Sequence, residues 1–268
     1  YSLANYLKNK NFSIKLTSDK RGSTYLKDYN NLNLLKISSS PLIKKNIFKL
    51  FNSFFIISFS IIKSLLTLLF DRPSLVVGMG GYSSFPICFA AFILRIKFII
   101  YENNLIIGKS NKYLLPFAKK IFVSYNELEG ISAKYKDKVI EVGNIVREEI
   151  INSNISNHSS TSLDSLNILV LGGSQAAKIF ADEFPLIFKK LRDSKIKIKI
   201  YQQCHNSQND RLSQFYKKAQ MDFEIFNFTS NIIDYYSKSN LVITRSGASV
   251  LGELVNFNIP FISIPLPT

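Results

Sequence analysis

Three glycine-containing turns stand out because each follows a short apolar run and precedes a helical stretch. They are Gly-Met-Gly-Gly-Tyr at residues 78–82, Gly-Gly-Ser-Gln at 172–175 and Arg-Ser-Gly-Ala at 245–248. Glycine lets the backbone approach a ligand closely, and the N–H groups that open a helix attract phosphate oxygens. None of the turns carries the lysine of a P-loop or a complete G-x-G-x-x-G pattern. The turns therefore favour a phosphate-bearing ligand that is bound without the usual nucleotide fingerprints.

The second and third turns carry polar groups suited to a nucleoside diphosphate. Ser174 adds a hydroxyl donor to the second turn, and Glu253 lies in the second turn of the helix that follows the third. A carboxylate at such a place accepts both hydroxyls of a ribose. Taken singly, the glycine turn is also compatible with a tight connection that binds nothing, and Glu253 with a solvated helix residue. Together they predict a nucleotide site whose diphosphate is a leaving group.

The elements that position these turns alternate in type along the chain, as in a parallel sheet with helices on both faces. We expect strands at residues 12–16, 75–77, 98–101, 120–123, 139–142, 166–171, 196–201, 223–225, 241–244 and 261–264. We expect helices at residues 2–10, 86–94, 111–118, 176–191, 210–220, 232–237 and 249–256.

A Ser- and Asn-rich stretch at residues 151–165 interrupts this alternation and is interpreted as a linker. The chain then consists of two Rossmann-like domains, residues 1–150 and 166–268. Ligands of such folds bind at the carboxyl ends of the strands, so we expect a cleft between the two sheets.

Residues 29–70 break the pattern, because they contain five lysines and no acidic residue. Within 47–70 the polar residues, except Ser58, form one narrow helical stripe, and the remaining residues are Phe, Ile and Leu. The charge-free run at 50–62 is short against the ~20 residues of a membrane span, which disfavours a spanning helix. Two interpretations stay open: an apolar helix buried in the domain, or a surface that dips into an anionic leaflet with its lysines at the headgroups.

The composition excludes some classes of function. The 268 residues have a net charge of +15 and an apolar fraction of 46%, which favours an anionic partner. Nucleic acid is disfavoured because no stacking surface of aromatic and basic residues is evident. Two cysteines and two histidines lack the spacing of a zinc site, and no Asp-x-Asp pattern occurs. We therefore expect no metal and no cofactor, and a reducing compartment.

Five motifs in register carry a resemblance to a known family. They are the three glycine turns, the last with its Glu253, together with Glu102-Asn103-Asn104 and Gly143-Asn144-Ile145-Val146-Arg147. In this order and spacing they resemble the MurG family, inverting glycosyltransferases of the GT-B type. The resemblance implies transfer of GlcNAc from UDP-GlcNAc to the 4-hydroxyl of the muramyl sugar of undecaprenyl-linked lipid I. It also implies a peripheral location on the cytoplasmic face of the bacterial inner membrane.

The resemblance assigns roles residue by residue. Asn104 and Arg147 are expected to contact the sugar and the diphosphate, Ser174 a phosphate, and Thr229 the uracil. The nucleoside is expected along Ala248, Ser249, Val250, Leu251, Gly252 and Glu253, with Glu253 on the ribose. The lipid diphosphate of the acceptor is expected at Gly80, Gly81, Tyr82 and Ser83. The membrane surface is expected at Lys49, Phe54, Ile57, Ile61 and Lys63.

The chain also departs from the family pattern. Tyr101 stands where the family has His, Ile145 where it has Pro, and Ala176 and His205 where it has Gly, with Gln202 for another His. The family's candidate general base lies in a loop that would precede Tyr1, and its last sugar-binding loop would follow Pro267. We interpret both ends as cut, leave the catalytic base unassigned, and expect residues 1–268 to bind UDP without transfer. The alternatives are another lipid-directed GT-B enzyme, such as a galactolipid synthase, and a non-catalytic fragment that binds UDP and membrane.

Overall fold

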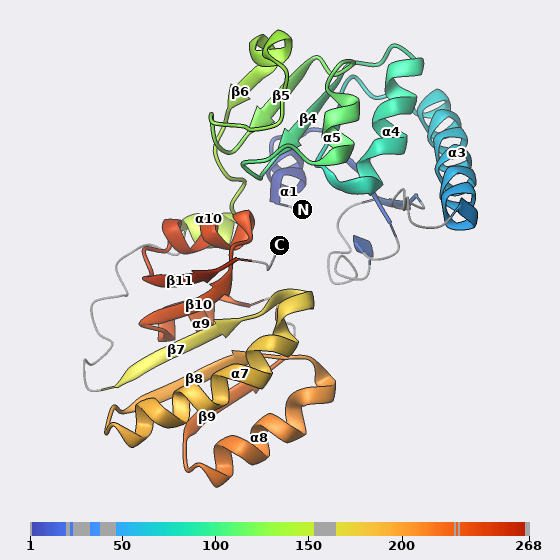
Figure 1. Cartoon of the computed structure of the whole chain (residues 1–268). Coiled ribbons are helices and arrows are strands. Elements are labelled where there is room, and N and C mark those ends of the chain that lie inside the picture. Colours follow the sequence, from blue (N-terminus) through green and yellow to red (C-terminus); the bar gives the residue numbers. More distant parts are fainter. Residues whose placement is uncertain are drawn as a thin grey trace. The chain divides into compact units, whose positions relative to one another are not determined.

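The computed structural model describes residues 2–19, 22–23, 33–37, 47–152, 165–227, 229 and 231–265 (Figure 1). The chain forms two compact units, Tyr1–Ile145 and Val146–Thr268. The predicted linker at 151–165 lies outside the described residues except at its ends.

The first unit contains a parallel four-stranded sheet. Its strand order is β3 (Val76–Gly78), β4 (Phe98–Glu102), β5 (Lys120–Val123) and β6 (Val139–Glu141). Phe98, Ile100 and Ile121 point into one core with α4 (Gly81–Ile93) and α5 (Lys109–Leu114). Two further strands, β1 (Lys15–Ser18) and β2 (Asn33–Lys36), pair in parallel as a separate sheet. The predicted strands at 75–77, 98–101, 120–123 and 139–142 are therefore present, whereas β2 and the 3-10 helix Ala133–Lys138 were not predicted.

Helix α4 begins at Gly81, so the predicted start at residue 86 is wrong. Pro86 lies in the second turn of the helix, which begins directly after its N-cap residue Gly80. Gly80 and Gly81 have φ values of 80° and 71°, in the left-handed region where a side chain is strained. The chain thus turns directly from the glycine pair into the helix.

Helix α3 (Ile47–Phe70) buries the serines of its polar stripe and leaves most of its large apolar side chains exposed, while Asn52 and Lys63 of the stripe are also exposed. It lies alongside α4 (Figure 1). Ser53, Ser60 and Ser64 are buried, and the Ser64 hydroxyl donates to the carbonyl of Ser60 at 2.7 Å. The exposed large apolar side chains of this helix are Phe51, Phe54, Phe55, Phe59, Ile62, Leu66, Leu69 and Phe70. The interpretation of a helix buried in the domain is therefore wrong: the buried side consists of serines together with Leu68, and most of the bulky residues are exposed.

The second unit contains a parallel five-stranded sheet in the order β11-β10-β7-β8-β9. The strands are β7 (Leu166–Leu171), β8 (Ile198–Gln203), β9 (Asp222–Phe226), β10 (Leu241–Arg245) and β11 (Phe261–Ile264). All five were predicted: β7 and β11 have the predicted bounds, and the ends of the other three shift by one or two residues. Alternation along β7 sends Ile168 and Val170 to one core and Leu169 and Leu171 to the other, as a sheet covered on both faces requires.

Helices cover both faces of this sheet. The core that contains Ile168 also contains side chains of α7 (Gly173–Asp193) and α8 (Asn209–Lys218). The core that contains Leu169 also contains side chains of α6 (Glu148–Asn152), α9 (Ile233–Lys238) and α10 (Ala248–Asn256). Helix α6 and the 3-10 helix Asn206–Gln208 were not predicted; each is too short to show a hydrophobic period.

Candidate functional site

Two of the predicted phosphate-binding turns lie at the same edge of the second sheet. Thr244 of β10 is paired with Leu171 of β7, so the turns that follow these strands start side by side. Gly172 precedes α7 and Gly247 precedes α10, and neither has a side chain to cap its helix. A Cβ atom on Gly247 would meet nothing within 4 Å. The N-terminus of α10 therefore presents main-chain N–H groups beside open space, and α7 begins at the same end of the sheet.

Arg245, which ends β10, adds positive charge to this edge. Its Nε and Nη2 atoms are buried and have no hydrogen-bond partner among the described residues. Two buried guanidinium nitrogens without a partner favour an anion. The sequence contained this arginine in the third turn, but no role was assigned to it.

The structure brings together two of the predicted donor-site residues. Arg147, immediately before α6, donates through Nε to Oε1 of Glu253 and through Nη2 to Oε2, both at 2.8 Å. Their side chains are 29% and 14% exposed. The hydroxyl of Tyr236 donates to Oε2 of Glu253 at 3.0 Å. The ribose-binding carboxylate of the prediction thus has three hydrogen bonds from its own chain.

Tyr236 was missed by sequence reasoning. Its side chain is 1% exposed, and its ring lies 5.6 Å from that of Phe257. Burial, and next the charge of Glu253, raise the pKa of its hydroxyl far above the usual range, so it stays a donor. In the sequence it is one of two adjacent tyrosines in the helix predicted at 232–237, and nothing there shows which hydroxyl meets the carboxylate.

The other predicted nucleoside contacts lie on α10 and on the loop before α9. Ala248 to Glu253 form the first turns of α10, with Ser249 exposed and Gly252 buried. The hydroxyl of Thr229 accepts from the N–H of Asn231 at 3.1 Å. The side chain of Ser174 is not among the described side chains of α7, so its predicted hydrogen bond to a phosphate of the donor stays a prediction.

In the first unit, a buried carboxylate holds Asn104. Glu102 is buried, and its Oε1 accepts from the amide side chain of Asn104 at 2.9 Å. Its Oε2 accepts from the N–H of Gly108 at 2.8 Å and from Asn111 Nδ2 at 3.0 Å. Glu102 therefore fixes the amide that was predicted to touch the sugar. A carboxylate directly after a buried strand is the signal that could have identified it.

Tyr101, at the position of the family's His, is the centre of a second network. Its hydroxyl oxygen lies 2.7 Å from Ser124 Oγ and 3.1 Å from the carbonyl oxygen of Gly143. It also accepts from the backbone N–H of Ile145 at 3.1 Å. These contacts join the ends of β4 and β5 to the Gly-Asn-Ile segment before Arg147. The tyrosine thus has a structural role here.

The other departures are also accommodated locally. His205 has φ −81° and its Nδ1 accepts from the N–H of Ser207, so this position needs no glycine. Gln202 is fully buried and accepts from the hydroxyl of Tyr216 at 2.5 Å. Ala176 lies within α7.

The predicted acceptor loop combines two glycines of positive φ with a helix start that no side chain caps. Gly80 and Gly81 have positive φ, and Tyr82 and Ser83 follow in the first turn of α4. The Ser84 hydroxyl donates to the carbonyl of Gly81 at 3.0 Å, which stabilises the turn. Tyr82 is exposed at the mouth of this turn.

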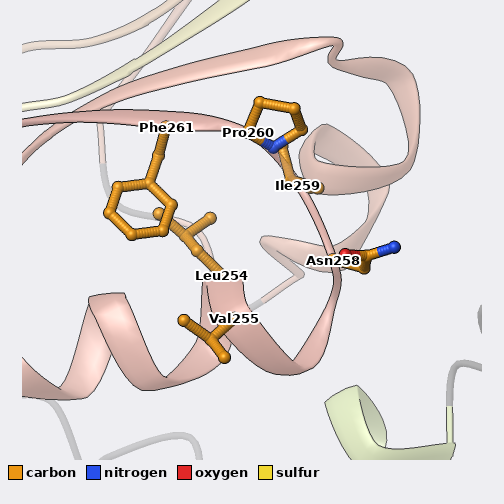
Figure 2. A pocket seen from close by; sticks show the side chains of 6 residues that line it. All are labelled: Leu254, Val255, Asn258, Ile259, Pro260 and Phe261. Carbon is orange, nitrogen blue, oxygen red and sulfur yellow. The ribbon is translucent and has the colours of Figure 1, made fainter.

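A cavity of about 290 Å³ lies at the opposite end of the second sheet, where the strands begin (Figure 2). It is lined by Leu254, Val255, Asn258, Ile259, Pro260 and Phe261. Because β11 begins at Phe261, this hollow adjoins the amino end of a strand, whereas the glycine turns adjoin carboxyl ends. It carries no titratable side chain and is separate from the candidate donor site. Among the described residues, no three His, Cys, Asp or Glu side chains gather where they could hold a metal.

Comparisons with known proteins agree with this arrangement. Residues 1–123 match the glycosyltransferase family 28 N-terminal domain, and residues 167–268 match the family 28 C-terminal domain. The chain is 35% identical over 260 residues to the UDP-N-acetylglucosamine–N-acetylmuramyl-(pentapeptide) pyrophosphoryl-undecaprenol N-acetylglucosamine transferase of Pelagibacter ubique. This alignment covers 96% of the chain and 71% of the relative. The transferase of the same name from Rickettsia felis is 35% identical over 219 residues, which cover 79% of the chain and 61% of that relative.

Solved structures show the same fold. The Acinetobacter baumannii MurG crystal structure superimposes with a TM-score of 0.71 at 22% identity, over 99% of this chain and 73% of that one. The S. aureus MnaA–UDP structure gives a TM-score of 0.63 at 17% identity, over 94% of this chain and 78% of that one. The predicted family and fold class are thereby confirmed: the chain belongs to glycosyltransferase family 28 and has the α/β fold of the MurG-like GT-B enzymes.

Proposed function

We propose that this protein transfers GlcNAc from UDP-GlcNAc to the 4-hydroxyl of the muramyl sugar of lipid I, which produces lipid II for peptidoglycan. The observation that carries the proposal is the 35% identity, over 96% of the chain, to a transferase whose name states this donor sugar and this undecaprenyl-linked acceptor. The alternative of a galactolipid synthase has no comparable support.

The second unit is proposed to bind the donor. Glu253 would accept the ribose hydroxyls, Thr229 would lie at the uracil, and the turns at Gly172 and Gly247 would hold the diphosphate. The uncapped helix N-termini and the buried guanidinium of Arg245 support an anion at this edge. Ser174 and Arg147 are proposed as further phosphate contacts.

The first unit is proposed to bind the acceptor. Gly80, Gly81, Tyr82 and Ser83 would contact the lipid diphosphate, because the N-terminus of α4 and the two glycines leave the backbone accessible. Asn104, held by Glu102, would contact the transferred sugar.

The reaction implied is a single displacement with inversion at the anomeric carbon. The acceptor hydroxyl loses its proton to a base and attacks that carbon, while the bond to the β-phosphate breaks and UDP leaves. The positive helix ends and the arginines of the donor site would stabilise the negative charge that develops on the leaving diphosphate. The base remains unassigned.

We further propose that the exposed face of α3 binds the cytoplasmic surface of the inner membrane. Phe54 and Phe59 are each more than 60% exposed, and Lys63 is exposed beside them. Of the other predicted membrane residues, Ile57 and Ile61 are half-buried, and the side chain of Lys49 lies outside the described residues. Residues Phe51–Phe70 are long and apolar enough to cross a bilayer by length and composition alone. We favour peripheral insertion because the buried serine side packs against α4.

The proposal is tested by supplying radiolabelled UDP-GlcNAc and a lipid I analogue, with UDP-galactose and diacylglycerol as the matched alternative pair. Transfer of GlcNAc to the lipid I analogue supports it and contradicts the expectation that residues 1–268 bind UDP without transfer. Galactose transfer to diacylglycerol contradicts the proposal. Calorimetry on the same preparation compares UDP with ADP and GDP. A preference for UDP is expected, because the donor site is proposed to be specific for uracil.

A further inference from the structure

We infer that Arg147 determines the specificity of the donor site for diphosphates: it occupies the carboxylate that the ribose requires, and a nucleoside displaces it efficiently only when a diphosphate offers the guanidinium a new partner. This inference rests on the proposed donor site in the second unit. It assigns to the Arg147–Glu253 pair a role in discriminating UDP-sugars from uridine.

The first step is the hydrogen-bond capacity of Glu253. A carboxylate offers about four lone-pair positions. Arg147 uses two of them and Tyr236 a third, at distances of 2.8, 2.8 and 3.0 Å. A ribose that donates both of its hydroxyls needs two positions, and about one is left. One of the three existing bonds must therefore break when the ribose binds.

The second step is which bond breaks. Tyr236 is 1% exposed and packs against Phe257, so its hydroxyl has no space to withdraw. The side chain of Arg147 is 29% exposed and lies just before the five-residue helix α6. The guanidinium can therefore swing away, whereas the phenol cannot. Tyr236 would keep Glu253 oriented while the ribose takes the places of Arg147.

The third step is the difference between ligands. A forked arginine–carboxylate pair is stronger than a neutral hydrogen bond, and a nucleoside that displaces it returns only hydroxyl bonds. Phosphate oxygens match the guanidinium fork as well as a carboxylate does. The turn at Gly172 lies at the same sheet edge as the helix of Glu253, because β7 and β10 are neighbours. A diphosphate held there can take over Arg147, and uridine alone cannot.

The experiment titrates uridine, UMP and UDP into the chain by calorimetry, with wild type, Arg147→Ala and Arg147→Lys. For Arg147→Ala we expect uridine to bind about three- to tenfold tighter, because its competitor is gone, and UDP about tenfold weaker. The Kd for uridine divided by the Kd for UDP then falls by at least about thirtyfold relative to wild type. Arg147→Lys keeps the positive charge but loses the forked geometry of the guanidinium, so its affinities for uridine and UDP should lie between those of wild type and Arg147→Ala. It also supplies the comparison if the alanine variant does not fold.

The matched control is Arg211→Ala, which removes the same charge from α8, where Arg211 pairs with Asp182. Both affinities should stay within about twofold of wild type, since only general electrostatics change. Uridine binding that is unchanged or weaker in Arg147→Ala would overturn the inference, while UDP binding by wild type would still support the donor site. Failure of wild type to bind UDP at all would instead overturn the proposed function, and this inference with it.

Discussion

The backbone N–H of Ile145 donates to the hydroxyl oxygen of Tyr101 at 3.1 Å. Both residues depart from the family pattern, in which a proline and a histidine stand at these positions. Proline has no N–H, so replacing it by isoleucine creates a donor that needs an acceptor. The tyrosine hydroxyl supplies that acceptor. The two departures thus compensate each other.

Replacing Tyr101 by Phe should therefore destabilise the first unit. The change leaves the Ile145 N–H without its partner inside a buried network, which costs about 1–3 kcal/mol of unfolding free energy. Denaturant titration measures it, with Tyr113→Phe on an exposed ring as the control. In an Ile145→Pro background the cost of Tyr101→Phe should shrink; equal costs in both backgrounds would show that the two positions are not coupled.

Glu253→Ala should weaken UDP binding by roughly 1–3 kcal/mol, the loss expected when hydrogen bonds to a charged group are removed. Calorimetry measures the change, and Glu183→Ala on the exposed face of α7 is the matched control. An unchanged UDP affinity in Glu253→Ala would show that the ribose does not bind to this carboxylate.

Vesicle binding should depend on the exposed face of α3. Phe59→Ser removes a side chain that is 68% exposed, so it should lower partition into anionic vesicles by about 1–2 kcal/mol, a factor of roughly 5–30, without unfolding the protein. Cosedimentation should also fall with added salt, because lysine attraction to the leaflet is screened. Ile187→Ser, on an exposed face of the second unit, is the control. Membrane association that survives carbonate extraction would indicate a spanning helix instead.

The buried serine stripe gives a test of how α3 is oriented. Ser64 is fully buried, so Ser64→Leu should force α3 and α4 apart and destabilise the first unit by about 1–3 kcal/mol. Leu66→Ser, on the exposed face, should change stability by less than about 0.5 kcal/mol. Thermal melts compare the two. The reverse ranking would mean that the helix packs through its apolar face.

Stability should fall in alkali. Burial raises the pKa of the Cys88 thiol from 9.0 to about 12 and that of Cys204 to about 11. These thiols stay neutral in the folded chain while they ionise in the unfolded one. Their contribution is thus complete below about pH 9 and is lost as pH rises through the folded pKa. Urea midpoints across this range should decline, and Cys88→Ala should flatten the decline even if it lowers stability overall.

Much of the fold could be predicted from local patterns. The apolar runs that became β4 and β7, each bounded by turn residues, identified both parallel sheets. Strand β2 could not be found this way, because Asn33 and Lys36 lie in a polar, lysine-bearing segment and its pairing with β1 is a tertiary contact. The start of α4 was predicted at residue 86, whereas the glycine pair at 80 and 81 turns the chain into the helix at Gly81.

The site shows a similar limit. Motif spacing identified Glu253 and Arg147, but not that they meet, since a hundred residues separate them and only the folded unit brings them together. For α3, helical periodicity showed that the serines share one side; it could not show that this side faces inward. Periodicity reports which residues share a face, and burial depends on the volume that the neighbouring helix leaves free.

The outward apolar face of α3 also affects how the protein unfolds. Eight large side chains on this helix are already in contact with water in the folded state, so unfolding adds less newly hydrated apolar area than the chain length suggests. The heat-capacity increment and the denaturant m-value of the first unit should be correspondingly small, because both scale with that area. Lipid that covers this face should raise both quantities. The unfolding free energy of the first unit should then show stronger curvature with temperature.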